Sequence, residues 1–537
     1  MEDEAFLLPT PNTPHPTPHP NQTLSYPELT LKMLTALILV PILGAILIGF
    51  LPTSEGSTLP RRTALAVAAG LFCYSFWLLT QLDLTNSGIQ FAEYFPWVPP
   101  IGLSYSLGVD GLALPLVVLN GLLTTFALYS TRATTGRPRL YYALVLLVNA
   151  GVTGAFLAQN LLLFLLFYEL ELIPVYFLIA IWGGSKSQYA ATKFLIYTAV
   201  SGILILAAFF GIAWLGGSSS FDLDTISTTG LSTKTQLILL AMVLVGFGIK
   251  IPLVPLHTWQ PDAYVESAPP IAILLGGILA KLGVYGLLRF GLDLFPEVWP
   301  LVAPGLAIIG SVTVIYGALS AIAQKDIKRM VAYSSIGHMG YILVAAAAST
   351  QLSVLGAVAQ AVSHGLILAL LFELVGIVEE KVGTRELDVL NGLMNPVRGL
   401  PLVSALLVTA GMASAGIPGL VGFAAEFIVF QGCFSVFPIC TLLCILASGL
   451  TAVYFAILLN RTCFGRLDNK LAYYPRVLFS EQIPALALTA IILVLGVQPN
   501  WLLRWMEPTT DAIAQSIVTS EAIAIAPAPS IPTNFVK

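Results

Sequence analysis

Long apolar runs recur almost from one end of this 537-residue chain to the other. Windows of about 20 residues, the length that crosses a bilayer as a helix, place fourteen spans. We expect them near 33–52, 63–82, 109–129, 140–158, 161–181, 191–215, 236–255, 269–290, 300–323, 329–348, 353–378, 402–430, 434–459 and 483–505. With 57% hydrophobic and only 10% charged residues, the chain is predicted to be an all-α polytopic membrane protein.

The two ends of the chain differ from this pattern. Residues 1–30 are polar and rich in proline, and residues 509–537 are similar. Such segments lack the apolar residues needed for a core. We therefore expect an N-terminal extension of no assigned role, a transmembrane domain over 31–508, and a polar, disordered or surface-lying C-terminal tail.

The sequence shows no sign of a bound cofactor. Its five cysteines have no metal- or cluster-binding spacing. No glycine-rich nucleotide motif lies between a strand and a helix. We expect neither a metal nor a redox centre on this chain.

Basic residues in the loops predict the orientation of the spans. With an even number of spans, one side of the membrane holds both termini and only Lys32, Lys234, Arg289, Arg504 and Lys537. The opposite side holds Arg61, Arg62, Arg132, Arg137, Arg139, Lys186, Lys193, Lys325, Lys328, Arg329, Lys381, Arg385, Arg398, Arg461, Arg466, Lys470 and Arg476. By the positive-inside rule the richer side is cytoplasmic, and the termini face away from it.

Two lysines remain inside the membrane. Lys250 lies in Gly246-Phe-Gly-Ile-Lys-Ile-Pro252, with a second proline at Pro255, and Lys281 lies in the middle of the eighth span. Glycine before Lys250 and proline after it predict a helix broken within the membrane. A charge beside such a break indicates an ion pathway.

Other ionisable residues also fall inside spans. They are Glu169 in the fifth, His338 in the tenth, His364 in the eleventh and Glu426 in the twelfth. Glu171 lies about 200° from Glu169 around a helix, so the two cannot both face one partner. Glu373 is nearer a span end and less suggestive.

The twelfth span resembles the seventh in its interruption. Gly411-Met-Ala-Ser-Ala-Gly-Ile-Pro-Gly419 breaks it, and Glu426 follows. Two broken helices five spans apart predict two inverted five-helix repeats, at about 140–290 and 300–459.

These residues could form a proton relay, because a nearby carboxylate controls whether a buried lysine keeps its proton. Glu169 would act on Lys250, and Lys281, the histidines and Glu426 would continue the path. Structural roles remain open for each residue. The glutamate and Lys250 could only lock two helices, the histidines could bond backbone carbonyls, and Glu426 could cap its helix. His257 could line a path or bond its loop.

Four motifs resemble the antiporter-like subunits of respiratory complex I. They are Lys250-Ile-Pro-Leu-Val-Pro-Leu-His-Thr-Trp-Gln-Pro-Asp-Ala263, Ala190-Ala-Thr-Lys-Phe-Leu-Ile-Tyr197, Asp326-Ile-Lys-Arg-Met-Val-Ala-Tyr-Ser-Ser-Ile-Gly-His-Met-Gly340 and Tyr168-Glu-Leu-Glu-Leu-Ile-Pro174. The similarity is to the subunit-four type, the D subunit of the cyanobacterial and chloroplast complex. It implies fourteen helices and a relay through Glu169, Lys250, Lys281, His338, His364 and Glu426. Only the resemblance favours Glu169 over Glu171.

The family implies a proton-translocating subunit in the thylakoid membrane, with lumenal termini. Partner subunits, including a sister antiporter-like subunit, would carry iron–sulfur clusters and pass electrons from ferredoxin to plastoquinone. The segment 459–468 resembles the variant specialised for carbon dioxide uptake. Two alternatives are a subunit of a multi-subunit sodium/proton antiporter, which shares these motifs, and a scaffold subunit that only holds the others.

Overall fold

The computed structural model describes residues 33–52, 58–131, 136–467 and 474–525. Its first elements are α1 (Met33–Phe50), α2 (Leu59–Thr80), β1 (Gln90–Val98), η1 (Pro99–Ile101), β2 (Leu103–Val109), α3 (Ala113–Ser130), α4 (Pro138–Leu157), α5 (Leu161–Leu170), α6 (Leu172–Trp182) and α7 (Ser187–Leu215). The middle elements are α8 (Thr233–Lys250), α9 (Trp259–Glu266), α10 (Pro269–Leu274), η2 (Leu275–Leu279), α11 (Ala280–Gly286), η3 (Leu287–Leu292), α12 (Trp299–Ile322) and α13 (Ile327–Ala348). The last are α14 (Gln351–Val382), α15 (Pro401–Ser414), α16 (Val421–Phe434), α17 (Pro438–Thr462), α18 (Phe479–Val497) and α19 (Asn500–Ile525).

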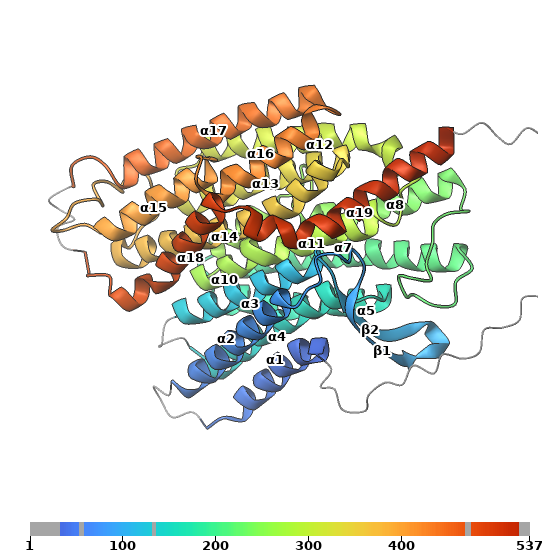
Figure 1. The fold of residues 1–537 in the computed structure, drawn as a ribbon. Coiled ribbons are helices and arrows are strands. Elements are labelled where there is room, and N and C mark those ends of the chain that lie inside the picture. The colour runs from blue at the N-terminus through green and yellow to red at the C-terminus, as the bar shows by residue number, and fades with distance from the viewer. Residues whose placement is uncertain (1–32, 53–57, 132–135, 468–473, 526–537) are drawn as a thin grey trace, which may run out of the picture.

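The helices form one bundle whose long axes run roughly the same way (Figure 1). Among the described residues, 13 helices are long and apolar enough to cross a membrane. The predicted twelfth span is the shorter pair α15 and α16, and counting this pair as one span gives the predicted fourteen. An 18-residue stretch of the eighth span, Pro269–Leu292, and one of the eleventh, α14, are wholly buried inside the protein. The ionisable residues of these two spans therefore lie at the centre of the bundle.

The seventh span is broken where glycine and proline predict it. Helix α8 ends at Lys250, and an irregular segment precedes α9. Other groups replace the missing helical hydrogen bonds: the Trp259 indole donates to the Ile249 carbonyl (2.9 Å), and the Val254 amide donates to the Thr313 hydroxyl (3.2 Å). Irregular backbone is tolerated at this depth because protein satisfies it.

The twelfth and eighth spans are irregular too. Between α15 and α16 the chain turns through Gly416 and Gly419, whose φ angles of +68° and +91° suit glycine. The eighth span includes two stretches of π-helix, η2 and η3, on either side of α11. Wide turns of this kind are frequent at functional sites. The predicted breaks in the seventh and twelfth spans are confirmed, whereas the residue limits of the two repeats stay a prediction.

A β-hairpin precedes α3, where the sequence prediction had only a loop. Strands β1 and β2 pair antiparallel, and η1 and Gly102 (φ +71°) connect them. Alternating side chains in Leu103-Ser-Tyr-Ser-Leu-Gly-Val109 are the signal that was available. The fold is thus helical with one small sheet.

The C-terminal segment differs from the predicted tail. Helix α19 continues to Ile525, and it buries Ile513, Ala514 and Ile517. Residues 509–517 therefore pack on the bundle, because an apolar stripe at helical spacing lies on this segment. The predicted extension over 1–30 and the last residues of the tail lie outside the described residues.

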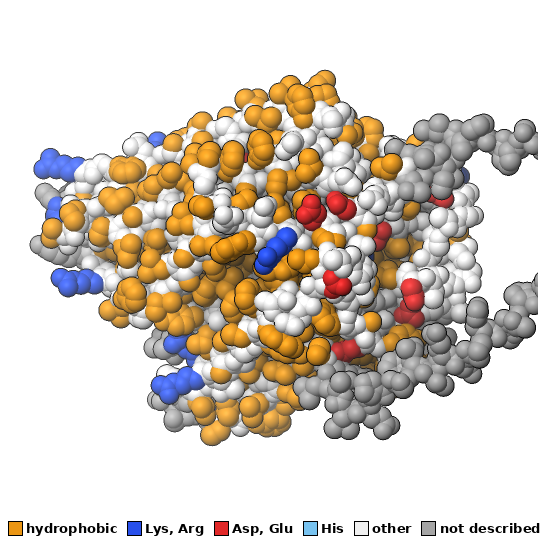
Figure 2. Space-filling view, in the orientation of Figure 1, with side chains coloured by type: hydrophobic (Ala, Val, Ile, Leu, Met, Phe, Trp, Pro, Cys, Tyr) orange, Lys and Arg blue, Asp and Glu red, His pale blue; other side chains and the backbone are white. Residues whose placement is uncertain are grey.

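The two ends of the bundle differ in charge. On the face shown in Figure 2, lysine and arginine gather at one end and most acidic side chains lie toward the other. The start of α1 and the end of α19 both point toward the acidic end (Figure 1). This arrangement agrees with the loop asymmetry in the sequence and with an even number of crossings.

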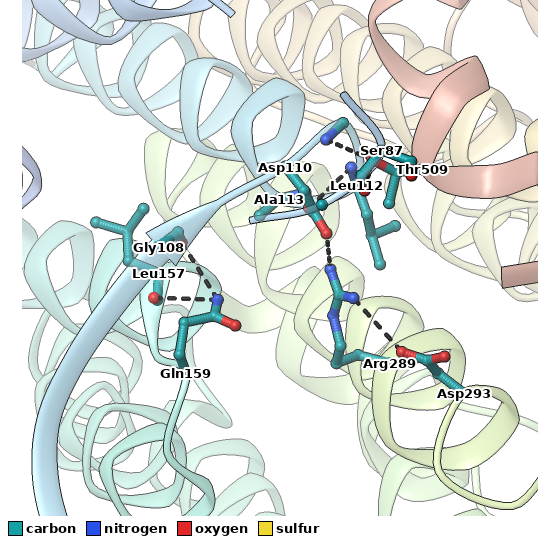
Figure 3. A network of polar contacts seen from close by, with 12 residues as sticks. Ser87, Gly108, Asp110, Leu112, Ala113, Leu157, Gln159, Arg289, Asp293 and Thr509 are labelled. Atoms are coloured by element: carbon teal, nitrogen blue, oxygen red, sulfur yellow. Dashed lines mark hydrogen bonds and ion pairs between the residues drawn. The ribbon is translucent and has the colours of Figure 1, made fainter. Parts of the chain in front are cut away.

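An ion pair closes the acidic end of the bundle (Figure 3). Arg289 of η3 pairs with Asp110, and the carboxylate of Asp110 also accepts the amides of Leu112 and Ala113 at the start of α3. Asp293 lies 3.6 Å from the guanidinium, and the neighbouring Gly111 amide donates to Thr509 of α19 (3.0 Å). The ion pair and the neighbouring hydrogen bond thus join the third span, the eighth span and α19.

Removing one member of this pair should destabilise the protein. Arg289→Met leaves the Asp110 carboxylate buried without its main cation, at a cost of roughly 3–5 kcal/mol. The double variant Arg289→Met/Asp110→Asn should recover most of the loss, because asparagine still caps α3 and no charge is stranded. Thermal unfolding of the detergent-purified protein measures both. A double variant as unstable as the single one would contradict the ion-pair interpretation.

Candidate functional site

The first buried cluster surrounds Lys250 at the end of α8. Its ammonium donates to the carboxylate of Glu171, and both side chains are buried. Aromatic faces enclose the same ammonium, with the ring of Tyr168 at 4.8 Å and that of Phe194 at 5.9 Å. We call Lys250, Glu171, Tyr168 and Phe194 the Lys250 cluster. It holds one cation and one anion out of contact with water.

Glu169 is not the carboxylate that pairs with Lys250. The fifth span is interrupted at Glu171, between α5 and α6, and this residue turns toward α8. Glu169 lies against Gly202 of α7, where an added Cβ would come within 1.8 Å of Glu169 Oε1. That oxygen is buried and has no hydrogen-bond partner among the described residues. The predicted contact is therefore made by Glu171, whereas no ion pair of Glu169 is found within the described residues.

The second cluster begins at Lys281 on α11. Its ammonium donates to the Gly276 carbonyl in η2 (2.6 Å) and lies 2.8 Å from Nδ1 of His364 on α14. The rings of His364 and His338 are 5.4 Å apart, and His338 Nε2 lies 3.4 Å from the carboxylate of Glu426 on α16. We call Lys281, His364, His338 and Glu426 the Lys281 cluster. Four of the six predicted residues thus form one continuous buried row.

Hydrogen-bond partners fix the protonation of the two histidines. His338 Nδ1 faces the Ser334 carbonyl (2.9 Å) and Nε2 faces the Ser414 carbonyl (3.1 Å). A carbonyl oxygen only accepts, so both nitrogens donate and the His338 ring is an imidazolium. An ammonium only donates, so His364 Nδ1 accepts from Lys281 and this ring is neutral. Lys281, His364 and His338 therefore each carry an exchangeable proton.

Glu426 is held by the break in its own span. Its Oε2 accepts from the Ser448 hydroxyl of α17 (3.0 Å). A Cβ on Gly416 would lie 2.7 Å from the same oxygen, so the turn must be glycine to leave room for the carboxylate. The glycine-rich interruption thus shapes the site as well as ending α15.

The two clusters are adjacent but not in contact. Helix α11 packs on the end of α8, and a Cβ on Gly283 would lie 3.1 Å from Lys250 Cβ. Gly283 is two residues from Lys281, about 200° around the helix, so Lys250 lies on one side of α11 and the Lys281 side chain on the other, toward α14. No direct bond between their ammonium groups is found in the part of the chain that the structure describes.

Two further positions clarify earlier expectations. His257 is buried with its ring 4.8 Å from that of Tyr316, and its Nδ1 has no partner among the described residues. Glu373, on α14, is also buried and lines a cavity, although its place near a span end gave no indication of this. Within the described ranges, no group of three or more His, Cys, Asp or Glu residues could hold a metal ion.

Comparison with known proteins places this arrangement in a family. Residues 158–451 match the family described as "NADH:quinone oxidoreductase/Mrp antiporter, TM". The NAD(P)H-quinone oxidoreductase chain 4 1 of Synechococcus elongatus is 41% identical over 498 residues, covering 90% of this chain and 92% of that protein. A chain 4 protein of Microcystis aeruginosa is 44% identical over 403 residues, covering 74% and 72%.

Solved structures agree in fold. A chain of respiratory complex I from Thermus thermophilus matches with a TM-score of 0.82 and 28% identity, covering 90% of this chain and 99% of that chain. A chain of the Mrp complex from Dietzia also has a TM-score of 0.82, at 21% identity, covering 92% and 100%. The chain therefore belongs to the NADH:quinone oxidoreductase/Mrp antiporter family, as a relative of the cyanobacterial NAD(P)H-quinone oxidoreductase chain 4 proteins.

Proposed function

We propose that this chain translocates protons as a membrane-arm subunit of a photosynthetic complex I. The observation that carries the proposal is the buried row from Lys281 through His364 and His338 to Glu426. Ionisable residues are rare inside membrane spans, and four in sequence mark a proton path. The relatives' names support a quinone oxidoreductase complex around this chain.

The protonation states suggest an order of transfer. His338 already carries two ring protons, so it can accept another only after it gives one up. Its Nε2 proton would pass to Glu426, 3.4 Å away. His364 can then pass on its Nε2 proton and take a proton at Nδ1 from Lys281 (2.8 Å). Proton release at Glu426 would thus come first. The site that lacks a proton, which we call the vacancy, would then move back from His338 through His364 to Lys281.

The Lys250 cluster would control when Lys281 gives up its proton and can accept the next one. While Glu171 holds the Lys250 ammonium, the positive charge of Lys250 is partly neutralised beside the α8–α11 interface. Separation of the pair would expose that charge to Lys281 and favour departure of its proton. We assign this role to Glu171, with Glu169 as the second carboxylate of the fifth span.

The surroundings follow from the same proposal. The basic end of the bundle would face the cytoplasm, and both termini the thylakoid lumen. A sister antiporter-like subunit would adjoin this one. Iron–sulfur clusters in partner subunits would carry electrons from ferredoxin to plastoquinone. The segment 459–468 supports the finer proposal of a complex specialised for carbon dioxide uptake, which the set of co-purifying subunits tests.

The sodium/proton antiporter alternative makes a different prediction. The match to the Mrp complex chain, at 21% identity, concerns the fold alone. Vesicles containing the purified complex should acidify during electron transfer with or without sodium. Sodium uptake that depends on an imposed pH difference, without any hydrophilic redox subunits in the preparation, would favour the antiporter.

Lys250→Ala should stop pumping by this subunit while the complex assembles, because no other cation in the described part of the chain pairs with Glu171. We expect a lower proton-to-electron ratio at unchanged quinone reduction. Lys234→Ala is the matched control, since Lys234 is an exposed lysine at the other end of the same helix. A normal ratio in an assembled Lys250→Ala complex would overturn the relay assignment.

Glu171→Gln and Glu169→Gln should separate the two carboxylates of the fifth span. Only the first removes the partner of Lys250, so it should slow proton transfer more, by at least about tenfold, or about 1.4 kcal/mol in barrier. Stopped-flow acidification of vesicles measures the rate. A larger effect of Glu169→Gln would show that Glu169, the residue favoured by the family resemblance, controls the charge of Lys250.

Glu426→Gln should block the exit of the row. Without an acceptor, His338 keeps its second ring proton and the vacancy never forms. We expect loss of pumping, with partial recovery in Glu426→Asp, while Ser448→Ala removes one hydrogen bond and has a small effect. Proton-to-electron ratios of the three variants decide the matter, and an active Glu426→Gln complex would exclude this exit.

A further inference from the structure

A cavity of about 560 Å³ opens at the basic end of the bundle. Its wall includes the connection between α6 and α7, the start of α10 and the end of α14. The row of the Lys281 cluster does not reach it. A volume of this size holds many water molecules. Water can therefore enter the protein from this end.

One side chain in the wall differs from the others. Glu373 is 4% exposed, whereas Glu379 and Glu380, near the end of the same helix, are each more than a third exposed. The cations of the cavity, Lys328 and Arg385, both pair with Glu379. No ion pair of Glu373 is found among the described residues, and the Ser130 hydroxyl, which lines the same cavity, has no hydrogen-bond partner there. A buried carboxyl without a counter-ion can hold a proton at low cost.

Helix α14 leads directly from this carboxyl to the relay. Glu373 is nine residues from His364, about 13 Å along the helix axis. Its neighbour Phe372 contacts Gly276, whose carbonyl accepts from Lys281. Helix α14 and the Phe372 side chain thus connect the cavity wall with the η2 carbonyl that binds the Lys281 ammonium.

A set of hydrogen-bonded polar side chains, which we call the ladder, lies between α3 and α4 and consists of Asn120, Thr124, Asn149 and Thr153. Between α3 and α4, Asn120 donates to Thr153 (2.9 Å) and to the Asn149 carbonyl (3.1 Å), and Asn149 donates to Thr124 (3.0 Å). All four side chains are buried, and Asn120 Oδ1 has no partner among the described residues. Ser130, which lines the cavity together with Glu373, is on the same helix as Asn120.

The inner end of the ladder lies near Lys281. Leu119, next to Asn120, would meet a Cβ on Gly365 at 2.8 Å, and the same Cβ would lie 3.6 Å from Lys281 Cε. Buried polar side chains in a membrane helix bundle mark the course that water and protons can follow. The ladder therefore extends the cavity toward the relay.

We propose that this cavity is the entrance for the proton and that Glu373 is its first carrier. The inference rests on the proposed function. A hydronium ion in the cavity gives its proton to the Glu373 carboxylate and becomes water. Glu373 passes the proton along the ladder, and the neutral amine of Lys281 accepts it. Charge and protons balance at each step without any other reactant.

The test compares variants in the assembled complex. Glu373→Gln should lower the proton-to-electron ratio to that of Lys281→Ala, and Glu373→Asp should recover part of it. Glu380→Gln, which alters an exposed carboxylate lining the same cavity, is the control and should pump normally. A normal ratio for Glu373→Gln beside a lowered one for Lys281→Ala overturns the entrance and leaves the proposed function intact. Normal ratios for both overturn the proposed function itself.

A second measurement does not depend on the stability of a variant. A hydrophobic carbodiimide reacts with a protonated carboxyl, so the wild-type complex should be modified at Glu373 and lose pumping in proportion. Peptide mass spectrometry locates the modification. Labelling at Glu380 but not at Glu373, or labelling at Glu373 with pumping retained, would contradict the proposal even if Glu373→Gln failed to assemble.

Discussion

A charge in the low-dielectric interior of this bundle persists only where the backbone supplies compensating groups. Lys250 ends α8, where unpaired carbonyl groups place partial negative charge. Lys281 follows π-helix η2 and donates to one of its carbonyls. Glu426 lies in the second turn of α16, toward the positive end of that half-helix. Each irregularity of a span thus stabilises a charge of the appropriate sign.

The same constraint explains why the six expected residues fall into two groups. A buried ion pair such as Lys250–Glu171 is costly to separate, since each partner would be left without compensation. The members of the Lys281 cluster are joined more loosely: Lys281 lies 2.8 Å from His364, the rings of the two histidines are 5.4 Å apart, and His338 lies 3.4 Å from Glu426. A tightly paired cluster is suited to switching and a loosely joined one to conduction. Helix α11, which packs on Lys250 at Gly283 and carries Lys281 on its other side, is where one cluster would act on the other.

Sequence reasoning succeeded where the signal is local. Apolar windows located the spans, and glycine and proline located the breaks at Lys250 and before Glu426, because both depend on neighbouring residues alone. The choice between Glu169 and Glu171 could not be made in this way. Glu171 keeps helical φ and ψ angles, so the two carboxylates do point to different sides, but the local sequence does not say which side meets α8. Glu373 was undervalued because its burial comes from α3 and α10, far away in sequence.

The two ends of the eighth span give the path a direction. Toward the basic end, Glu373 and the cavity approach Lys281 with no cation between them that lacks a carboxylate partner. Toward the acidic end, Tyr285 and Arg289 follow Lys281 at successive intervals of four residues, and Arg289 is buried against Asp110. A guanidinium keeps its proton at any ordinary pH, so Arg289, held by Asp110, cannot pass a proton to Lys281 from that end. A proton on Lys281 therefore has one open approach behind it and one way forward, through His364.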